Sequence, residues 1–228
     1  AWVSRLVTGP LKAMVRATQA FSQGQPHGDL PLQRQDEIGE LARSFHDMEQ
    51  QIGRHMTELN TSRDAMSHLA HHDALTGLPN RRMFEQRLAQ ALELSRRSGR
   101  DCAVLFVDLD DFKGVNDAHG HAVGDLVLQA AARTITGAVR QADTVARLAG
   151  DEFTVLCENV DTEDAALQVA AKLKRAFDTP LVIEGQPLRV RPSIGLSLFP
   201  RDAQDAHSLL ASADAAMYRS KPGHRGHT

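Results

Sequence analysis

Aromatic residues and cysteines are scarce in this chain of 228 residues, and it contains no long apolar run. Aromatics make up 4% of the sequence within an apolar fraction of 42%, so a core must consist mainly of Leu, Val, Ala and Ile. The two cysteines, Cys102 and Cys157, lie in short apolar runs, which favours buried free thiols in a reducing compartment over a disulfide. No run of about 18 apolar residues exists, so we expect neither a transmembrane helix nor a signal peptide within the sequence.

A large excess of charge of one sign is also absent. The formal net charge is −3, acids and bases are interspersed, and no basic stripe with interleaved aromatics is present. We therefore expect no binding of nucleic acid, which relies on a dense array of cationic side chains. A polyanionic nucleotide bound by this chain would need metal ions to offset its charge.

The N-terminal part of the sequence predicts two helices. Residues 6–22 are amphipathic, and the segment Gly24–Gly28 ends that helix. A second helix is expected to begin near Asp36-Glu37, where acidic side chains suit a helix N-terminus. Its apolar side chains recur every seven residues, at Ile38, Phe45, Ile52, Leu59 and Met66. The companion positions are Leu41, Met48, His55, Ser62 and Leu69. This heptad pattern predicts a coiled coil with a partner helix, with a long surface helix on a globular domain as the alternative.

This region resembles a HAMP domain. The resemblance rests on Pro10-Leu11, on Asp36-Glu37-Ile38-Gly39-Glu40-Leu41, and on the following Phe45 and Met48. HAMP domains are helix–connector–helix modules that dimerise as a parallel four-helix bundle beneath a transmembrane helix. The resemblance therefore implies a homodimer and a membrane span before residue 1. The opening residues Ala1-Trp2-Val3-Ser4-Arg5 agree with that, because tryptophan beside arginine is typical of a membrane interface.

Beyond residue 70 the pattern changes to mixed strands and helices. Helices are expected at 82–98, 121–140, 162–177 and 205–220, and strands at 102–108, 181–183 and 188–198, with a β-hairpin over 144–157. This mixture predicts an α+β fold in which helices pack on an antiparallel or mixed sheet. We expect three regions: 1–57 as the HAMP-like module, 58–71 as a coiled-coil linker, and 72–228 as the α+β domain.

Two acidic clusters follow apolar strands in this second part. Asp108-Leu109-Asp110-Asp111 follows the run Val104–Val107, and Asp151-Glu152 lies at the tip of the hairpin. If the two strands are neighbours, Asp108, Asp151 and the main-chain carbonyl of Leu109 would form an oxygen cage for Mg²⁺. The alternative is that these acids only make the loops soluble. The adjacent His71 and His72 are not expected to bind a metal, since no third ligand is evident.

At these residues the sequence resembles the GGDEF family of diguanylate cyclases over residues 70–225. The motifs that carry the resemblance are Asp73–Arg81, Phe106–Lys113, Asn116-Asp117, Gly120-His121, Gly124-Asp125, Ala149–Phe153, Ser193-Ile194-Gly195 and Ala213–Tyr218. The family has a palm-like fold similar to nucleotide cyclases and condenses two GTP molecules into cyclic di-GMP with release of two pyrophosphates. The resemblance thus implies a nucleotidyltransferase that uses Mg²⁺ or Mn²⁺.

The resemblance also implies roles for single residues. Asp108, the Leu109 carbonyl and Asp151 would hold the metal, with Asp151, Glu152 and Lys113 as the catalytic groups. The expected guanine-pocket and phosphate-binding residues are Phe112, Asn116, His121, Asp125, Lys221 and Arg225. Within this set an aspartate can accept both the N1 and N2 protons of guanine, which adenine does not offer. The product cyclic di-GMP would bind at Arg140, Asp143 and Lys172.

The sequence departs from the family pattern at three places. Ala149 replaces the first glycine of the signature, which would cost about 1 kcal/mol if that position required a positive φ. The family glycine before Arg225 is a histidine here, so the direction of that arginine is open. Lys172 stands where the family usually has an arginine, and lysine lacks the planar fork that grips a guanine edge. We therefore expect weak or absent product inhibition, with a helix-end salt bridge as the alternative for Arg140 and Asp143.

Each domain can bind one GTP, and the resemblance implies that two half-sites must face each other in a dimer. The HAMP-like module and coiled coil would then control how the half-sites meet, at the cytoplasmic face of a bacterial inner membrane. One alternative function is a catalytically silent module that binds GTP or cyclic di-GMP. Another is a dimerisation module that relays a signal to a separate output domain.

Overall fold

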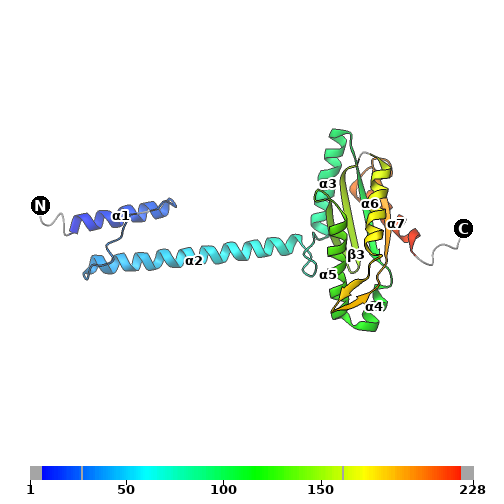
Figure 1. Ribbon diagram of the computed structural model, residues 1–228. Helices are drawn as coiled ribbons and strands as arrows, with labels where there is room; N and C mark the ends of the chain where they lie inside the picture. The colour runs from blue at the N-terminus through cyan, green and yellow to red at the C-terminus, as the bar shows by residue number, and fades with distance from the viewer. Residues whose placement is uncertain (1–6, 27, 161, 222–228) are drawn as a thin grey trace. The chain divides into compact units, whose positions relative to one another are not determined.

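The computed structural model describes residues 7–26, 28–160 and 162–221, without the side chains at positions 60, 62–65 and 67–69. The chain divides into two compact units, Ala1–Met66 and Ser67–Thr228, and the division falls within the predicted linker. Figure 1 shows the helices and strands of both units. Among the described residues, no helix combines the length and the apolar character needed to cross a bilayer.

The first unit contains two helices, α1 (Gly9–Ser22) and α2 (Glu37–His71), which run in the same direction (Figure 1). Met14 and Ala17 of α1 pack against Ala42 and Phe45 of α2 in a small core. Phe21 also meets Phe45 edge to face, with ring centroids 6.0 Å apart. The two predicted helices are therefore present, and they bury one apolar stripe between them.

The connector between the helices is tied to α2 at two points. Arg43 donates hydrogen bonds to the carbonyls of Leu32 and Arg34, at 3.0 Å and 2.7 Å. Gly39 lies so close to the main chain at Arg34 that a Cβ there would overlap the Arg34 carbonyl. The glycine and the arginine thus hold the connector against the first turns of α2.

Most of the heptad stripe on α2 remains exposed in the single chain. Phe45 is buried, whereas Leu41, Met48 and Ile52 are 40–50% exposed. Further along the helix, Leu59 and Met66 are 65% and 68% exposed. The heptad positions Ser62 and Leu69 lie outside the described side chains. A long helix with such a stripe has apolar surface that a partner helix could cover.

The second unit is built on a four-stranded antiparallel sheet. Its strands are β1 (Asp101–Leu109), β2 (Thr144–Ala149), β3 (Glu152–Val160) and β6 (Pro192–Phe199), in the order β2-β3-β1-β6. β1 lies inside the sheet and is buried along almost its whole length. The predicted hairpin is formed by β2 and β3.

The strand predicted over 188–198 is wrong in one respect, because two separate strands cover this region. A turn at Glu184-Gly185, with positive φ at both residues, pairs β4 (Leu181–Ile183) with β5 (Gln186–Leu188) in a small hairpin. Such a turn matches the natural twist of two antiparallel strands. The chain then leaves this hairpin, and β6 begins at Pro192, which has no N–H and therefore suits the start of an edge strand.

Helices cover both faces of the sheet (Figure 1). α3 (Arg81–Ser98) and α7 (Ala206–Ser220) pack on one face, while α5 (His121–Ala138) and α6 (Glu163–Ala176) pack on the other. The short helix α4 (Phe112–His119) follows β1. The predicted α+β, palm-like fold with an antiparallel sheet is therefore confirmed. The register of these strands decides which of their side chains meet at the end of β1.

The two cysteines lie on opposite faces of the sheet. Cys102 belongs to the core under α3 and α7, and Cys157 belongs to the core under α5 and α6. Both are buried free thiols, and burial raises the pKa of each to about 12. The expectation of buried, unpaired cysteines is confirmed.

The close approach of α7 to β6 depends on Gly195. A Cβ at this position would overlap the carbonyl of Ala213 and the main-chain nitrogen of Met217. The helix backbone therefore lies directly on the strand. This contact matters for the site, because α7 ends at Ser220 and so fixes where Lys221 begins.

Replacing Gly195 with alanine should destabilise the protein strongly, because α7 must move away from β6 to admit the new methyl group. We expect a loss of about 3 kcal/mol in the free energy of unfolding, measured by urea denaturation. Gly137→Ala is the control, since that glycine is on α5 with open space around it and should be neutral or slightly stabilising. Equal stability of the two variants would contradict the packing argument.

Candidate active site

Acidic residues from two strands meet at the carboxyl end of β1. Asp108 stands directly opposite Glu152 on β3 and opposite Ser193 on β6. Residues paired across antiparallel strands point to the same face, so all three lie on the face that carries α3 and α7. Asp108 is 7% exposed, which is unusual for a carboxylate. A buried carboxylate needs a cation or hydrogen-bond donors nearby.

The tip of the β2–β3 hairpin places Asp151 beside Asp108. Gly150 has a φ of 51°, a conformation that glycine adopts without strain. Ala149 has no positive φ and pairs with Glu152, after a shift of register between Arg147 and Ala149. The strain considered for Ala149 is therefore not present, because only the second glycine of the signature occupies the left-handed position.

Arg147 holds this tip in place. Its Nε donates to the carbonyl of Gly150 at 2.9 Å, and its Nη1 contacts both carboxylate oxygens of Asp73 at 2.9 and 3.1 Å. Asp73 also accepts hydrogen bonds from the N–H and hydroxyl of Thr76. Burial opposes the ionised form of Asp73, but the hydrogen bonds from Thr76 and Arg147 outweigh it and lower the pKa. Sequence reasoning did not assign this role to Arg147, because its partner lies 74 residues away.

The two acids at the hairpin tip are electrostatically strained in the absence of a bound cation. Burial, followed by the charge of Asp108, raises the pKa of Asp151. Burial also raises the pKa of Glu152, although the guanidinium of Arg81, 3.9 Å away, opposes that shift. Asp214 on α7 adds to the negative charge around Glu152. The site therefore concentrates negative charge that a divalent cation would neutralise.

Lys221 provides positive charge at this point. Its Nζ lies 2.9 Å from Oδ1 of Asp108, and this hydrogen bond raises the pKa of the lysine. The predicted role of Lys221 was to bind phosphates, whereas the structure places its ammonium group on Asp108. Arg225, predicted for the same role, lies outside the described residues.

The main-chain carbonyl of Leu109 points toward the hairpin tip. Leu109 is opposite Pro192, and the N–H of Asp110 donates to the carbonyl of Arg191 at 2.8 Å. In an antiparallel ladder this makes Leu109 and Pro192 a non-hydrogen-bonded pair, so the carbonyl of Leu109 faces away from β6 and toward β3. β3 begins at Glu152, so the carbonyl is on the side of Asp151.

These oxygen atoms fit Mg²⁺ or Mn²⁺. Two carboxylates and one main-chain carbonyl are hard oxygen ligands, and they leave positions for water and for phosphate oxygens. The ammonium group of Lys221 contacts the carboxylate of Asp108, so this carboxylate already has a cation as its partner. Within the described residues, no group of three or more His, Cys, Asp or Glu side chains could hold a metal, His71 and His72 included. Asp108, Asp151 and the carbonyl of Leu109 are therefore the candidate donors at this site.

Other predicted residues are on α4 and α5, which follow β1. Phe112 and Asn116 of α4 face Gly124 of α5, where a Cβ would overlap the amide oxygen of Asn116. His121 and Asp125 are exposed on the first two turns of α5, and Lys113 is exposed on α4. The structure thus brings Asn116 and Phe112 together over a glycine that leaves room for them.

Two of the three predicted product-binding residues, Arg140 and Asp143, lie in one turn, whereas Lys172 is on a separate helix. Asp143 accepts a hydrogen bond from the main-chain N–H of Arg140 at 2.9 Å, in the turn between α5 and β2. The contact is to the main chain and not to the guanidinium, so it differs from the salt bridge considered as an alternative. Lys172 is exposed on α6.

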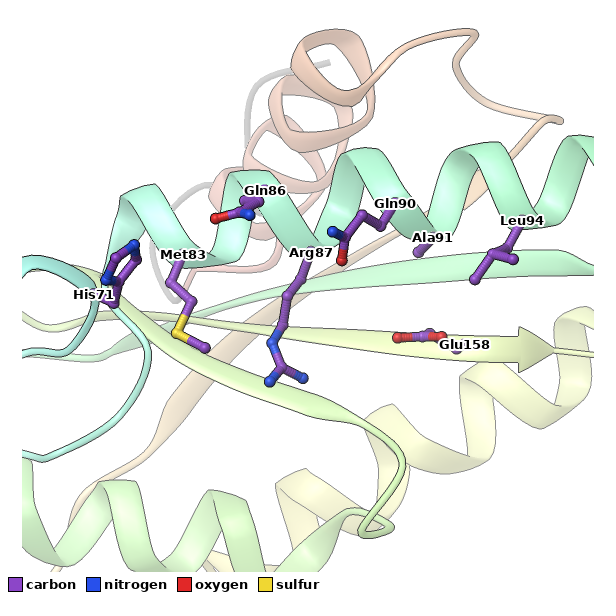
Figure 2. Close-up of a pocket in the computed structure, with 8 residues that line it drawn as sticks. All are labelled: His71, Met83, Gln86, Arg87, Gln90, Ala91, Leu94 and Glu158. Atoms are coloured by element: carbon purple, nitrogen blue, oxygen red, sulfur yellow. The ribbon is translucent and has the colours of Figure 1, made fainter. Parts of the chain in front are cut away.

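A cavity of about 450 Å³ lies along α3 (Figure 2). It is lined by His71 at the end of α2, by Met83, Gln86, Arg87, Gln90, Ala91 and Leu94 of α3, and by Glu158 of β3. Arg87 donates to the hydroxyl of Thr144 at 3.3 Å. None of the predicted site residues lines this cavity, so the chemistry argued above does not depend on it.

Comparison with known proteins identifies the families of both parts of the chain. Residues 70–227 match the model of the diguanylate cyclase GGDEF domain, and residues 2–52 match that of the HAMP domain. The chain therefore belongs to the GGDEF family of diguanylate cyclases, with a HAMP domain on the N-terminal side. Both resemblances stated from the motifs are confirmed.

Individual relatives support the same assignment. The chain is 47% identical over 165 residues to the bifunctional diguanylate cyclase/cyclic di-GMP phosphodiesterase MucR of Pseudomonas aeruginosa, over 72% of this chain and 24% of MucR. It is 35% identical to the diguanylate cyclase TpbB of the same organism, over 97% of this chain and 52% of TpbB. The chain thus spans about half or less of the length of these curated relatives.

Solved structures resemble the second unit. The GGDEF domain of TpbB superposes with a TM-score of 0.65 and 43% identity, over 66% of this chain and 88% of that chain. The coiled coil and GGDEF domain of DgcB from Caulobacter crescentus, in complex with c-di-GMP, gives a TM-score of 0.67 at 25% identity, over 81% of this chain and 96% of that chain.

Replacing Asp151 with asparagine should stabilise the metal-free protein at neutral pH. The pKa of Asp151 is raised in the folded state, so ionisation of this group costs stability above the folded pKa. Below its ordinary value of 3.8 the carboxyl is neutral in both states and the cost disappears. After allowance for solvent screening, we expect a rise in Tm of about 2 °C at pH 7 that fades toward acid pH.

Scanning calorimetry in EDTA measures this difference. Asp164→Asn, an exposed aspartate in the first turn of α6, is the control and should show no such gain. A lower Tm for Asp151→Asn than for the wild type at pH 7 would show that the two carboxylates do not repel each other.

Proposed function

We propose that the chain condenses two GTP molecules into cyclic di-GMP and releases two pyrophosphates. The observation that carries this proposal is the juxtaposition of Asp108, Asp151 and the inward-facing carbonyl of Leu109 at the end of β1. Membership of a family whose relatives are named diguanylate cyclases supports the same reaction.

Asp108, Asp151 and the Leu109 carbonyl would hold Mg²⁺ or Mn²⁺, which when bound neutralises the triphosphate and polarises the phosphate that is attacked. Asp151, beside the metal, would help accept the proton of the attacking 3′-hydroxyl. Glu152, opposite Asp108, keeps the site negative, and its contact with Arg81 holds it at the edge of the site. The Gly150 turn presents main chain without a Cβ to the triphosphate.

Lys221 changes partners in this proposal. Without substrate its ammonium group neutralises Asp108, and with metal and GTP bound it moves to the β- and γ-phosphates. Lys113 and Arg225 would supply further positive charge to the phosphates. Lysine suits such a role, since its flexible stem lets one ammonium group serve two partners.

Asn116 and Asp125 would read the guanine base, with Phe112 and His121 lining the pocket. A base that lacks the N1 and N2 protons would leave these polar groups without partners, which opposes its binding. Arg140, Asp143 and Lys172 would bind cyclic di-GMP weakly. Loss of one bidentate arginine contact corresponds to roughly 1–3 kcal/mol.

The active form would be a dimer, because each domain binds one GTP and each 3′-hydroxyl attacks the phosphate held by the partner subunit. We propose that the exposed stripe on α2 forms the coiled coil that aligns the two half-sites. The solved DgcB structure likewise joins a coiled coil to a GGDEF domain. The HAMP domain would transmit a signal from a membrane span outside this sequence, at the cytoplasmic face of a bacterial inner membrane.

The reaction is tested by incubating the protein with GTP and Mg²⁺ and following cyclic di-GMP and pyrophosphate by chromatography. Asp151→Asn should lower the rate by about 1,000-fold or more, because the residue that it changes is both a metal ligand and a proton acceptor in this proposal. Asp164→Asn should retain the full rate. Wild-type protein that binds GTP or cyclic di-GMP tightly but forms no product would favour a silent binding module.

The role of α2 is tested by placing charge on its stripe. In the full chain, Ile52→Asp combined with Leu59→Asp should weaken dimerisation and lower the rate per molecule about tenfold, because buried aspartates oppose a coiled-coil seam. Sedimentation velocity and product formation at matched concentrations measure the two effects. Glu58→Gln is the control on the same helix. A double variant that stays dimeric and fully active would contradict control by α2.

A further inference from the structure

We propose that Ser193 is a positioning residue of the metal site. Its hydroxyl group holds Asp110 so that the Leu109–Asp110 peptide keeps its carbonyl oxygen directed at the metal. This inference rests on the proposed function, because it concerns the same metal site.

The first observation is the hydrogen bond itself. Ser193 is 3% exposed, and its Oγ donates to Oδ1 of Asp110 at 2.6 Å. Such a length is typical of a hydroxyl bound to an ionised carboxylate, which is among the stronger hydrogen bonds in proteins. Ser193 stands directly opposite Asp108 in the sheet, yet its bond goes to Asp110. The carboxylate of Asp108 is therefore left available to Lys221 and to a metal.

The second observation is that β6 holds Asp110 at its main chain as well. The N–H of Asp110 donates to the carbonyl of Arg191 at 2.8 Å. This N–H and the carbonyl of Leu109 belong to one peptide group, which is planar and trans, so its two polar atoms point in opposite directions. Fixing Asp110 to β6 from both its N–H and its side chain therefore fixes the direction of the Leu109 carbonyl toward β3.

Loss of the Ser193 hydroxyl would weaken this anchoring. The Leu109–Asp110 peptide would then be held to β6 only through the N–H of Asp110. The carbonyl of Leu109 would be less firmly directed at the metal, so the metal would bind more weakly. Removing a group that hydrogen-bonds to metal-binding residues and orients them commonly lowers the metal affinity by about 10- to 100-fold.

The same strand supplies a matched control. Ser197 is four residues further along β6, on the same face of the sheet, and is fully buried. Among the described residues its hydroxyl has no hydrogen-bond partner. Ser193→Ala and Ser197→Ala thus make the same chemical change in the same strand, and only the first breaks the bond to Asp110.

The test measures Mn²⁺ affinity directly, by electron paramagnetic resonance of free Mn²⁺ with the full chain. Mn²⁺ that still binds to the Asp108→Asn variant is bound elsewhere on the protein and is subtracted. We expect Ser193→Ala to weaken this affinity about tenfold and to raise the Mg²⁺ concentration for half-maximal activity similarly. Ser197→Ala should leave both unchanged, and Ser193→Thr, which keeps a hydroxyl group, should restore most of the affinity.

A double-mutant cycle separates positioning from general damage. Asp110→Ala should weaken Mn²⁺ binding to a similar extent, and the double variant should be no weaker than either single one. Asp110 is partly exposed, so this variant also serves if Ser193→Ala does not fold. Equal Mn²⁺ affinity of Ser193→Ala and Ser197→Ala, or of Asp110→Ala and the wild type, would overturn the inference. Wild-type protein that binds Mn²⁺ but makes no cyclic di-GMP would overturn the proposed function alone, because the affinities still decide this inference.

Discussion

Repulsion between Asp108 and Asp151 is the constraint on which the rest of the site depends. The sheet register brings one carboxylate to the buried end of β1 and the hairpin brings a second beside it. Folding alone would not favour two such charges in one place, because each loses hydration and each raises the free energy of the other. Their proximity makes sense when a cation is part of the functional state. Lys221, which contacts Asp108, supplies positive charge in the chain itself.

The packing of the second unit positions the residues that meet at this end of the sheet. The hairpin tip is held by Arg147, which joins the carbonyl of Gly150 to the carboxylate of Asp73 near the end of α2. On the opposite side of β1, the backbone contact at Gly195 sets α7 against β6 and so brings Lys221 to Asp108. Residues from both ends of the second unit thus position the groups at the end of β1.

Much of this arrangement follows from local patterns in the sequence. The apolar run Val104–Val107 predicted β1, and the heptad spacing predicted α2 as one long helix. The acidic clusters marked the end of β1 and the tip of the β2–β3 hairpin. What the sequence did not predict are contacts that depend on register. The bond from Ser193 to Asp110 spans 83 residues and that from Arg147 to Asp73 spans 74, and neither leaves a local signal. The break between β5 and β6 was missed for another reason, since a short strand followed by an apolar strand has the same period as one longer strand.

The central claim is that Asp108, Asp151 and the carbonyl of Leu109 together bind the divalent cation that the proposed cyclase requires. Crystals of the protein grown with Mn²⁺ and GTP, with diffraction collected at the manganese absorption edge, would test it most directly. The account predicts an anomalous peak within about 2.3 Å of oxygens from all three residues, with Lys221 no longer on Asp108. A peak bound by Glu152 and Asp214 instead, or Mn²⁺ bound only to the nucleotide, would contradict it.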